Sequence, residues 1–302
     1  IIEIGCNDGS MLNFFNKNEF DCLGFEPSGN VAEIAQKKGM KIIPDFFSTT
    51  QSQALEFIAK TKIVYAANVI CHIPDLKNLI KSIDQFLTKD GLFIFEEPYL
   101  GSMVNKVSYD QIYDEHVYIF SVTSIKKIFD EFNFDLIDVI PQITHGGSMR
   151  YVVARRDEYK IKDGVKLHET REREIQLDNF DGLLEFKKNC LLSKEQTLNN
   201  LHNFKKKGLS IAGYAATSKS TTVLNFCGID NKIIDCIYDT TPDKIGKFSP
   251  GTHIPIVNYD KFKNNYPDIV YLFAWNHKNE IFKKETVFND KGGKWFSHVD
   301  LK

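Results

Sequence analysis

The chain opens with IIEIGCNDGSML, residues 1–12, and this stretch decides the fold. An apolar run indicates a buried strand, and a turn containing Gly5 and Gly9 leads into a helix expected from Ser10 to about Lys17. Glycine permits a tight turn and lets a ligand approach the backbone closely. A strand that passes into a helix through such a turn is typical of nucleotide-binding α/β folds.

An acidic residue at the end of the next apolar segment indicates which class of ligand the turn binds. Glu26 lies 21 residues after Gly5, where dinucleotide folds place a carboxylate on the ribose hydroxyls. The pattern GxGxxG is absent because Asn7 occupies the middle glycine position, which disfavours an NAD-dependent oxidoreductase. The turn therefore favours a nucleoside over a pyrophosphate.

Strand and helix patterns alternate through residues 1–156 and close with two β segments joined by THGG, residues 144–147. The expected helices include one at residues 51–60 and one at residues 122–132 that Ser121 can N-cap. This order predicts an α/β fold, a doubly wound Rossmann-like sheet with an antiparallel edge. Residues 157–207 are charged and helical and are expected to form a connector. Alternation then resumes, which predicts a second Rossmann-like domain at residues 208–302.

The composition of the 302 residues excludes several classes. A formal net charge of −2 gives no electrostatic basis for nucleic-acid binding or methylation. No apolar run approaches the ~20 residues of a membrane span. Six scattered cysteines without a CxxC pair indicate reduced thiols in a cytoplasmic protein and argue against a zinc site. Because the chain lacks an initiator methionine and begins inside a strand, we expect a fragment whose N-terminal part is missing.

The second domain contains a similar strand–turn–helix pattern in GYAATSKSTTVLNFCGI, residues 213–229. Helix N-termini attract anions through free N–H groups and the helix dipole. Simple capping by Ser218, with Lys219 in solvent, is the alternative reading. Asp239 ends the next strand and is a candidate for ribose or for a neighbouring backbone. His253, in a Gly- and Pro-containing loop, is a candidate substrate contact or a structural histidine.

The segment IYDEHVYIF, residues 112–120, carries Asp114, Glu115 and His116 within an aromatic and β-branched run. Charged groups are costly to bury unless they are paired. With EIGCNDG, NVICHIPDL, FEEPYL, THGGSMR, GYAATSKSTTVLNFCGI and PGTHIPI, this segment resembles the nucleotide-sugar C-methyltransferases. The resemblance runs in order over essentially the whole chain.

That family methylates C-3 of a nucleotide-linked 4-keto deoxysugar, and its first half is a class I S-adenosylmethionine-dependent methyltransferase. The resemblance implies S-adenosylmethionine as cofactor and a nucleotide sugar as substrate. Family members carry an additional N-terminal zinc-binding domain, so zinc is expected only in that missing part and no metal in this chain. The family often has His at the position of Asp114, whereas Tyr113, Glu115 and His116 are retained.

The resemblance, together with the fold pattern, assigns expected roles to individual residues. Cofactor contacts are expected at Glu3, Gly5, Asn7, Gly9, Glu26, Pro27, Asp45, Phe46 and Asn68. Substrate contacts are expected at Tyr99, His145, Ser148, Tyr214, Ser218, Lys219, Ser220, Thr221, Asp239 and His253. Core packing is the alternative for Tyr99, and turn chemistry is the alternative for His145 and Ser148.

A carbon next to a ketone becomes a nucleophile when a base removes its proton and the enolate oxygen is stabilised. We assign His116 as the base, since an unperturbed imidazole has a pKa of about 6.5. Glu115 would orient the imidazole, Tyr113 would donate to the oxyanion, and Asp114 is expected to be dispensable. His72 is the rival base or an oxyanion donor.

The backbone of this segment decides which side chains meet. In a helix Tyr113 and His116 share a face, whereas in a strand Asp114 lies on the side of His116. Two other functions remain open, namely O- or N-methylation of a small metabolite and an inactive nucleotide-binding module. A monomer or a small homo-oligomer is expected, without a membrane or nucleic-acid partner.

Overall fold

The computed structural model describes residues 1–15 and 20–300, and these group into two compact units. Unit 1 comprises Ile1–Gly101 and Glu115–Asp178, and unit 2 comprises Ser102–Asp114 and Asn179–Lys302. The expected connector is divided between the units, because α5 (Asp163–Glu174) belongs to unit 1 and α6 (Phe180–Lys206) to unit 2. Ser102–Asp114, a short stretch from the middle of the sequence, also belongs to unit 2, which the alternation of strands and helices did not predict.

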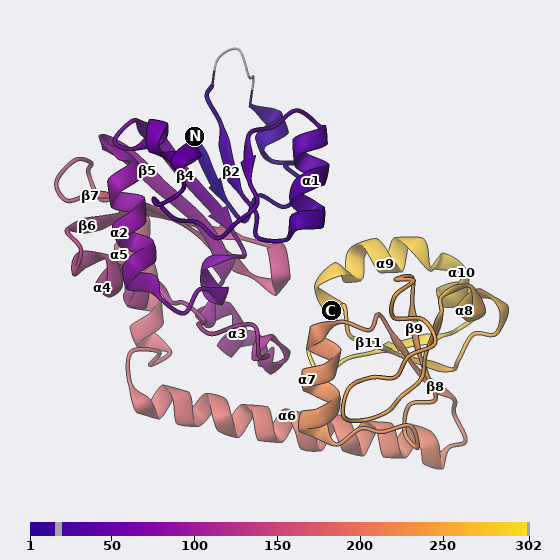
Figure 1. Cartoon of the computed structure of the whole chain (residues 1–302). Coiled ribbons are helices and arrows are strands. Elements are labelled where there is room, and N and C mark those ends of the chain that lie inside the picture. Colours follow the sequence, from indigo (N-terminus) through magenta and orange to yellow (C-terminus); the bar gives the residue numbers. More distant parts are fainter. Residues whose placement is uncertain (16–19, 301–302) are drawn as a thin grey trace. The chain divides into compact units, whose positions relative to one another are not determined.

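Unit 1 is built on a seven-stranded sheet in the order β3-β2-β1-β4-β5-β7-β6 (Figure 1). The first five strands are parallel, and β7 runs antiparallel to both β5 and β6. The predicted doubly wound sheet with an antiparallel end is therefore confirmed. The strands are β1 (Ile2–Ile4), β2 (Leu23–Phe25), β3 (Ile42–Ile43), β4 (Thr61–Ala67), β5 (Leu87–Pro98), β6 (Phe134–Gln142) and β7 (Ser148–Arg155).

The core of unit 1 follows from aromatic residues on the central strands. Phe93 and Phe95 of β5 stack on each other, and Phe95 also stacks on Tyr151 of β7, with ring centroids 4.7 and 4.9 Å apart. Ser121 caps α4 as predicted, and the cap is reciprocal with Ser124. The helices are α1 (Gly29–Lys37), α2 (Leu76–Phe86), α4 (Val122–Asp130) and α5.

Two expected helices of unit 1 are shorter and tighter than predicted. The helix expected after the first turn is the 3₁₀ turn η1 (Leu12–Phe14), and residues 16 and 17 lie outside the described part of the chain. The helix expected at residues 51–60 is the 3₁₀ helix η2 (Ser52–Phe57). Other 3₁₀ turns are η3 (Ile70–His72) and η5 (Thr144–Gly146).

Unit 2 contains a parallel five-stranded sheet in the order β10-β9-β8-β11-β12, which confirms a second Rossmann-like sheet. α7 packs against the long helix α6 (Figure 1). The strands are β8 (Ile211–Tyr214), β9 (Ile237–Asp239), β10 (Ile256–Asn258), β11 (Ile269–Leu272) and β12 (Lys294–Phe296). The helices and 3₁₀ turns are α6, α7 (Ser218–Cys227), α8 (Asp260–Asn264), η6 (Trp275–His277), α9 (Lys278–Lys284) and α10 (Thr286–Asp290).

The middle stretch that joins unit 2 begins within α3 (Leu100–Lys106) and includes the 3₁₀ turn η4 (Tyr109–Gln111). None of the helices in the described residues is both long enough and apolar enough to span a bilayer.

Candidate functional site

The turn after β1 requires its two glycines. Gly5 and Gly9 have φ of 66° and 74°, in the left-handed region that glycine favours. A Cβ on Gly5 would lie 2.5 Å from a methyl carbon of Val69, and one on Gly9 would overlap the sulfur of Met40. The positive φ of Asn7, 52°, completes the turn. The backbone is thus shaped to stay close to whatever occupies the carboxyl end of β1.

Two acidic residues flank this turn, as predicted. The carboxylate of Glu26 accepts hydrogen bonds from the backbone N–H of Asn7 at 3.0 Å and of Ser28 at 2.8 Å, so it ties the two turns together. Glu3 is 6% exposed, and its Oε2 has no hydrogen-bond partner among the described residues. Burial, reinforced by the nearby Asp8 carboxylate, raises the pKa of Glu3 to about 7. Glu3 is therefore a buried acceptor that a cationic ligand would satisfy.

A cavity of about 650 Å³ opens beside the turn, at the carboxyl ends of the central strands of unit 1. Four of the sequence-derived candidates lie on its wall: Gly5, Pro27, Phe46 and His72. The Phe46 side chain is 74% exposed, which leaves an aromatic face available for a base to stack on. The backbone N–H of Phe46 donates to the carboxylate of Asp45 at 2.7 Å.

Asn68 follows β4 in a left-handed conformation, with φ of 55°. Its backbone N–H donates to the carbonyl of Glu96 at 2.8 Å. Its side-chain Oδ1 is buried without a hydrogen-bond partner among the described residues. Such an orphaned acceptor is costly unless a ligand or water supplies a donor. The glycine turn, Glu3 and Asn68 together fit a cofactor with a cationic amino acid part and a nucleoside.

The segment IYDEHVYIF is neither a helix nor a strand, because a turn at Asp114 and Glu115 interrupts it. Nδ1 of His72 lies 2.6 Å from the backbone carbonyl of Glu115, and the rings of His72 and His116 have centroids 5.2 Å apart. The two predicted bases are thus neighbours. The side chains of Asp114 and Glu115 are exposed, and the expectation that Asp114 is dispensable stays a prediction.

The three remaining unit 1 candidates have partners within the fold. Tyr99 is buried, and its hydroxyl donates to Glu172 at 2.9 Å, which favours the packing alternative. Ser148 is buried and donates to the carbonyl of Thr144 at 3.1 Å. His145 is exposed in η5 with φ of 52°. Turn chemistry explains these two positions, and a sugar contact at any of the three stays a prediction.

Unit 2 has a cavity of about 310 Å³ at the carboxyl ends of β8 and β9, with Tyr214 and Asp239 on its wall. The Asp239 carboxylate accepts from the N–H groups of Ala216 and Thr241, both at 2.7 Å. Burial opposes ionisation of Asp239, but these hydrogen bonds bring its pKa below the ordinary value. The hydroxyl of Tyr214 donates to the buried Glu285 at 2.7 Å. Ligands of parallel sheets bind at this end of the strands.

The N-terminus of α7 has a cavity of its own, of about 430 Å³, which Ser218, Ser220 and Thr221 line together with Lys244 and Lys247. The cap is Thr217, which accepts from the N–H of Ser220 at 3.1 Å, so the predicted capping by Ser218 is wrong. The exposed candidate His253 lies in the turn after Ser249, whose carbonyl accepts its N–H at 3.0 Å.

Lys219 has a different environment from the other residues at this helix end. Its ammonium lies 5.2 Å from the ring centroid of Trp275 and interacts electrostatically with the buried Asp110. The alternative that placed Lys219 in solvent is wrong, since the side chain is half-buried. Asp110 also accepts from Nε1 of Trp275 at 2.7 Å, and its Oδ1 lies 3.2 Å from Nε2 of His298. This buried cluster anchors η4 within unit 2, and sequence reasoning missed it.

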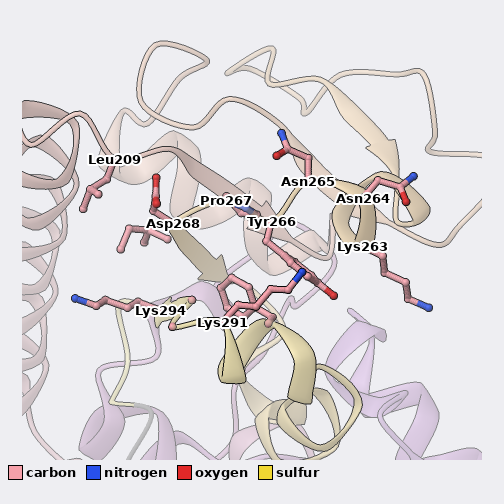
Figure 2. A pocket seen from close by; sticks show the side chains of 13 residues that line it. Leu209, Lys263, Asn264, Asn265, Tyr266, Pro267, Asp268, Lys291 and Lys294 are labelled. Atoms are coloured by element: carbon pink, nitrogen blue, oxygen red, sulfur yellow. The ribbon is translucent and has the colours of Figure 1, made fainter.

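A further cavity of about 430 Å³ lies at the amino ends of β11 and β12, the opposite end from Asp239. Figure 2 shows Lys291 beside Tyr266, whereas Lys263 and Lys294 extend away on opposite sides, Lys294 on the side of Asp268. Because parallel sheets bind ligands at their carboxyl ends, we assign no substrate to this cavity.

The strand order of unit 1, its glycine turn and the acidic ends of β1 and β2 define a class I S-adenosylmethionine-dependent methyltransferase. Residues 1–139 match the family described as methyltransferase domain. Residues 143–299 match the family described as C-methyltransferase C-terminal domain, and the chain belongs to that family. The protein is therefore an S-adenosylmethionine-dependent C-methyltransferase.

The chain is also similar to individual known proteins. The chain is 28% identical over 297 residues to the C-methyltransferase NovU of Streptomyces niveus, covering 98% of this chain and 71% of NovU. The solved PH0226 protein of Pyrococcus horikoshii OT3 is 16% identical, with a TM-score of 0.40. The match covers 51% of this chain and 81% of the PH0226 chain. Magnesium protoporphyrin IX methyltransferase of Synechocystis PCC 6803, solved with bound SAH, is 19% identical, with a TM-score of 0.39. The match covers 51% of this chain and 73% of that methyltransferase.

Proposed function

We propose that this C-methyltransferase acts on the carbon next to the ketone, C-3, of a nucleotide-linked 4-keto deoxysugar. The observation that carries the proposal is the pair of imidazoles, His72 and His116, with His72 on the wall of the 650 Å³ cavity. A C–H next to a ketone needs a base with a pKa near neutrality, and imidazole is such a base.

In the proposed reaction, His116 takes the proton from the sugar carbon, the electron pair of that C–H bond becomes the carbon–carbon double bond of an enolate, and the π pair of the ketone moves onto its oxygen. The carbon–carbon π pair then forms the bond to the methyl group as the ketone is restored. S-adenosylmethionine, when bound, supplies the methyl group and leaves as the neutral thioether. Tyr113 remains the expected donor to the oxyanion, on the strength of the family resemblance.

The hydrogen bond of His72 limits what each of its ring nitrogens can do in the proposed reaction. A carbonyl oxygen only accepts, so Nδ1 of His72 carries the hydrogen toward Glu115 and Nε2 of the neutral ring has the free lone pair. His72 can therefore donate to an oxyanion from Nε2 only as an imidazolium, and as a neutral ring it is a second base. Glu115 acts here through its backbone carbonyl, which fixes His72, whereas its carboxylate was expected to orient His116.

A nucleotide-bearing substrate is supported by unit 2 taken by itself. The Asp239 cavity and the hydroxyls at the N-terminus of α7 supply an acceptor for a ribose and donors for a phosphate.

Solvent isotope exchange tests the assignment. Nucleotide-linked 4-keto deoxysugars are incubated in D₂O with the parent enzyme, His116→Ala and His72→Ala, and deuterium at carbon is followed by NMR beside methyl transfer. We expect His116→Ala to lose both exchange and methylation, and His72→Ala to keep exchange. Exchange that survives in His116→Ala but not in His72→Ala would reverse the two roles. Methylation without any carbon exchange in the parent would indicate O- or N-methylation.

A further inference from the structure

One residue beside the two imidazoles has no part in the proposed reaction. Cys71 precedes His72 in η3, and the thiol sulfur and one ring nitrogen each of His72 and His116 all lie within 4.8 Å of one another. Cys71 is a free thiol, 1% exposed. Thiolate and imidazole are the ligands that bind Zn²⁺ most often in proteins.

The cluster is held in place from both sides. The backbone N–H of Tyr118 donates to the carbonyl of Cys71 at 3.2 Å, and Nδ1 of His72 is fixed by the carbonyl of Glu115. In zinc sites a histidine ligand characteristically donates its second N–H to a carbonyl or carboxylate, which aims the other nitrogen at the metal. The contact between His72 and Glu115 has this form and leaves Nε2 free to bind.

The distances between the three ligand atoms suit a small cation once the side chains move slightly closer together. Zinc binds nitrogen at about 2.0–2.1 Å and sulfur at about 2.3 Å, so tetrahedral ligands lie roughly 3.3–3.8 Å apart. The ligand atoms here are separated by at most 4.8 Å, a difference that small side-chain rotations can close. A soft sulfur ligand selects zinc over magnesium or calcium.

We propose that Cys71, His72 and His116 form a site for a thiophilic divalent cation such as Zn²⁺, with its fourth position open. Binding exchanges the Cys71 thiol proton, which leaves to solvent, for a sulfur–metal bond. Because the lone pair of His116 is then engaged by the metal, His116 can no longer accept a proton. Binding of the cation therefore inhibits methyl transfer. This inhibition, unlike the cation site itself, rests on the proposed function of His116 as base.

Cobalt reports the sulfur ligand directly. The 302-residue chain is titrated with Co²⁺, and the thiolate-to-cobalt absorption is compared with that of Cys71→Ser. Serine keeps the shape of the side chain and replaces the soft sulfur with a hard oxygen, and the other five cysteines are common to both proteins. We expect a saturable band in the parent and at least a ~tenfold loss of affinity in Cys71→Ser, since even indirect support of a metal ligand is worth that much. An equal band and affinity in both proteins would overturn the site.

Zinc inhibition then separates this site from the proposed function. We expect Zn²⁺ to abolish methylation in the parent, a chelator to restore it, and Cys71→Ser to require about tenfold more zinc. Cysteine-dependent cobalt binding without zinc inhibition would keep the site but refute inhibition and the role of His116 as base. Cysteine-independent cobalt binding would refute the site and leave the proposed function intact.

Discussion

Glu3 should make cofactor binding depend on pH. Its pKa of about 7 in the free protein means that the carboxyl is half protonated at neutrality. If the carboxylate meets the ammonium of the methionine moiety, S-adenosylmethionine binds the ionised form, and affinity falls below that pKa. A single proton with a pKa near 7 predicts about a tenfold weaker Kd at pH 6 than at pH 8.

The same shift predicts the stability of the free protein. The pKa of Glu3 rises from 4.5 to about 7 on folding, so this contribution is fully present below pH 4.5 and is lost as the pH rises through 7. The full shift corresponds to an upper bound of about 3 kcal/mol at alkaline pH. Glu3→Gln removes the titration and should be more stable than the parent at pH 8.

Titration calorimetry at pH 6 and pH 8, on the parent and on Glu3→Gln, tests the argument. The parent should show the tenfold change and release protons on binding at pH 6, whereas Glu3→Gln should bind weakly with little dependence on pH. The comparison with Glu3→Gln separates the effect of Glu3 from that of every other group near the cavity. A parent Kd that is constant between the two pH values, or a pH dependence that persists in Glu3→Gln, would refute the reasoning.

Three further substitutions separate cofactor, packing and catalytic positions. Gly5→Ala forces a Cβ against Val69 at a positive φ, so it should lower the free energy of unfolding by about 1–3 kcal/mol and weaken cofactor binding, as denaturation and calorimetry would show. Tyr99→Phe removes one hydrogen bond to Glu172 and should cost about 1 kcal/mol in urea denaturation with methylation nearly unchanged; a large loss of activity would restore Tyr99 as a sugar contact. Asp114→Asn alters an exposed side chain and should keep kcat within about threefold, which steady-state assays would check.

Much of the fold was predictable because its signals are local. The strand before Gly5, the acid at Glu26 and the cap at Ser121 each follow from residues within one turn or strand. The doubly wound class of the sheet and its antiparallel edge followed from the alternation of strands and helices and from the terminal hairpin, since crossover rules leave few topologies. The two 3₁₀ segments were predicted as α-helices because hydrophobic spacing over so few residues does not separate the two forms.

The site was less predictable because its contacts are distant in sequence. His72 and Glu115 are 43 residues apart, and Asp110 and Trp275 are 165 apart. No periodicity encodes such pairs, and the turn at Asp114 belonged to neither of the two regular forms that were weighed. No zinc site was predicted because cysteines and histidines are not clustered along the sequence, whereas in the structure Cys71 lies close to imidazoles on two separate segments.

The discontinuity of unit 2 sets the order in which the chain acquires its structure. Asp110 emerges during translation 165 residues before Trp275, and at ~5–20 residues per second that delay is on the order of ten seconds. Throughout it the Ser102–Asp114 stretch has none of the C-terminal partners that bury its carboxylate. Residues up to Asp178 complete unit 1, so its sheet can form while the stretch carrying Tyr113 is still solvent-exposed. The nascent chain thus gains the frame for its cofactor first and secures that stretch last.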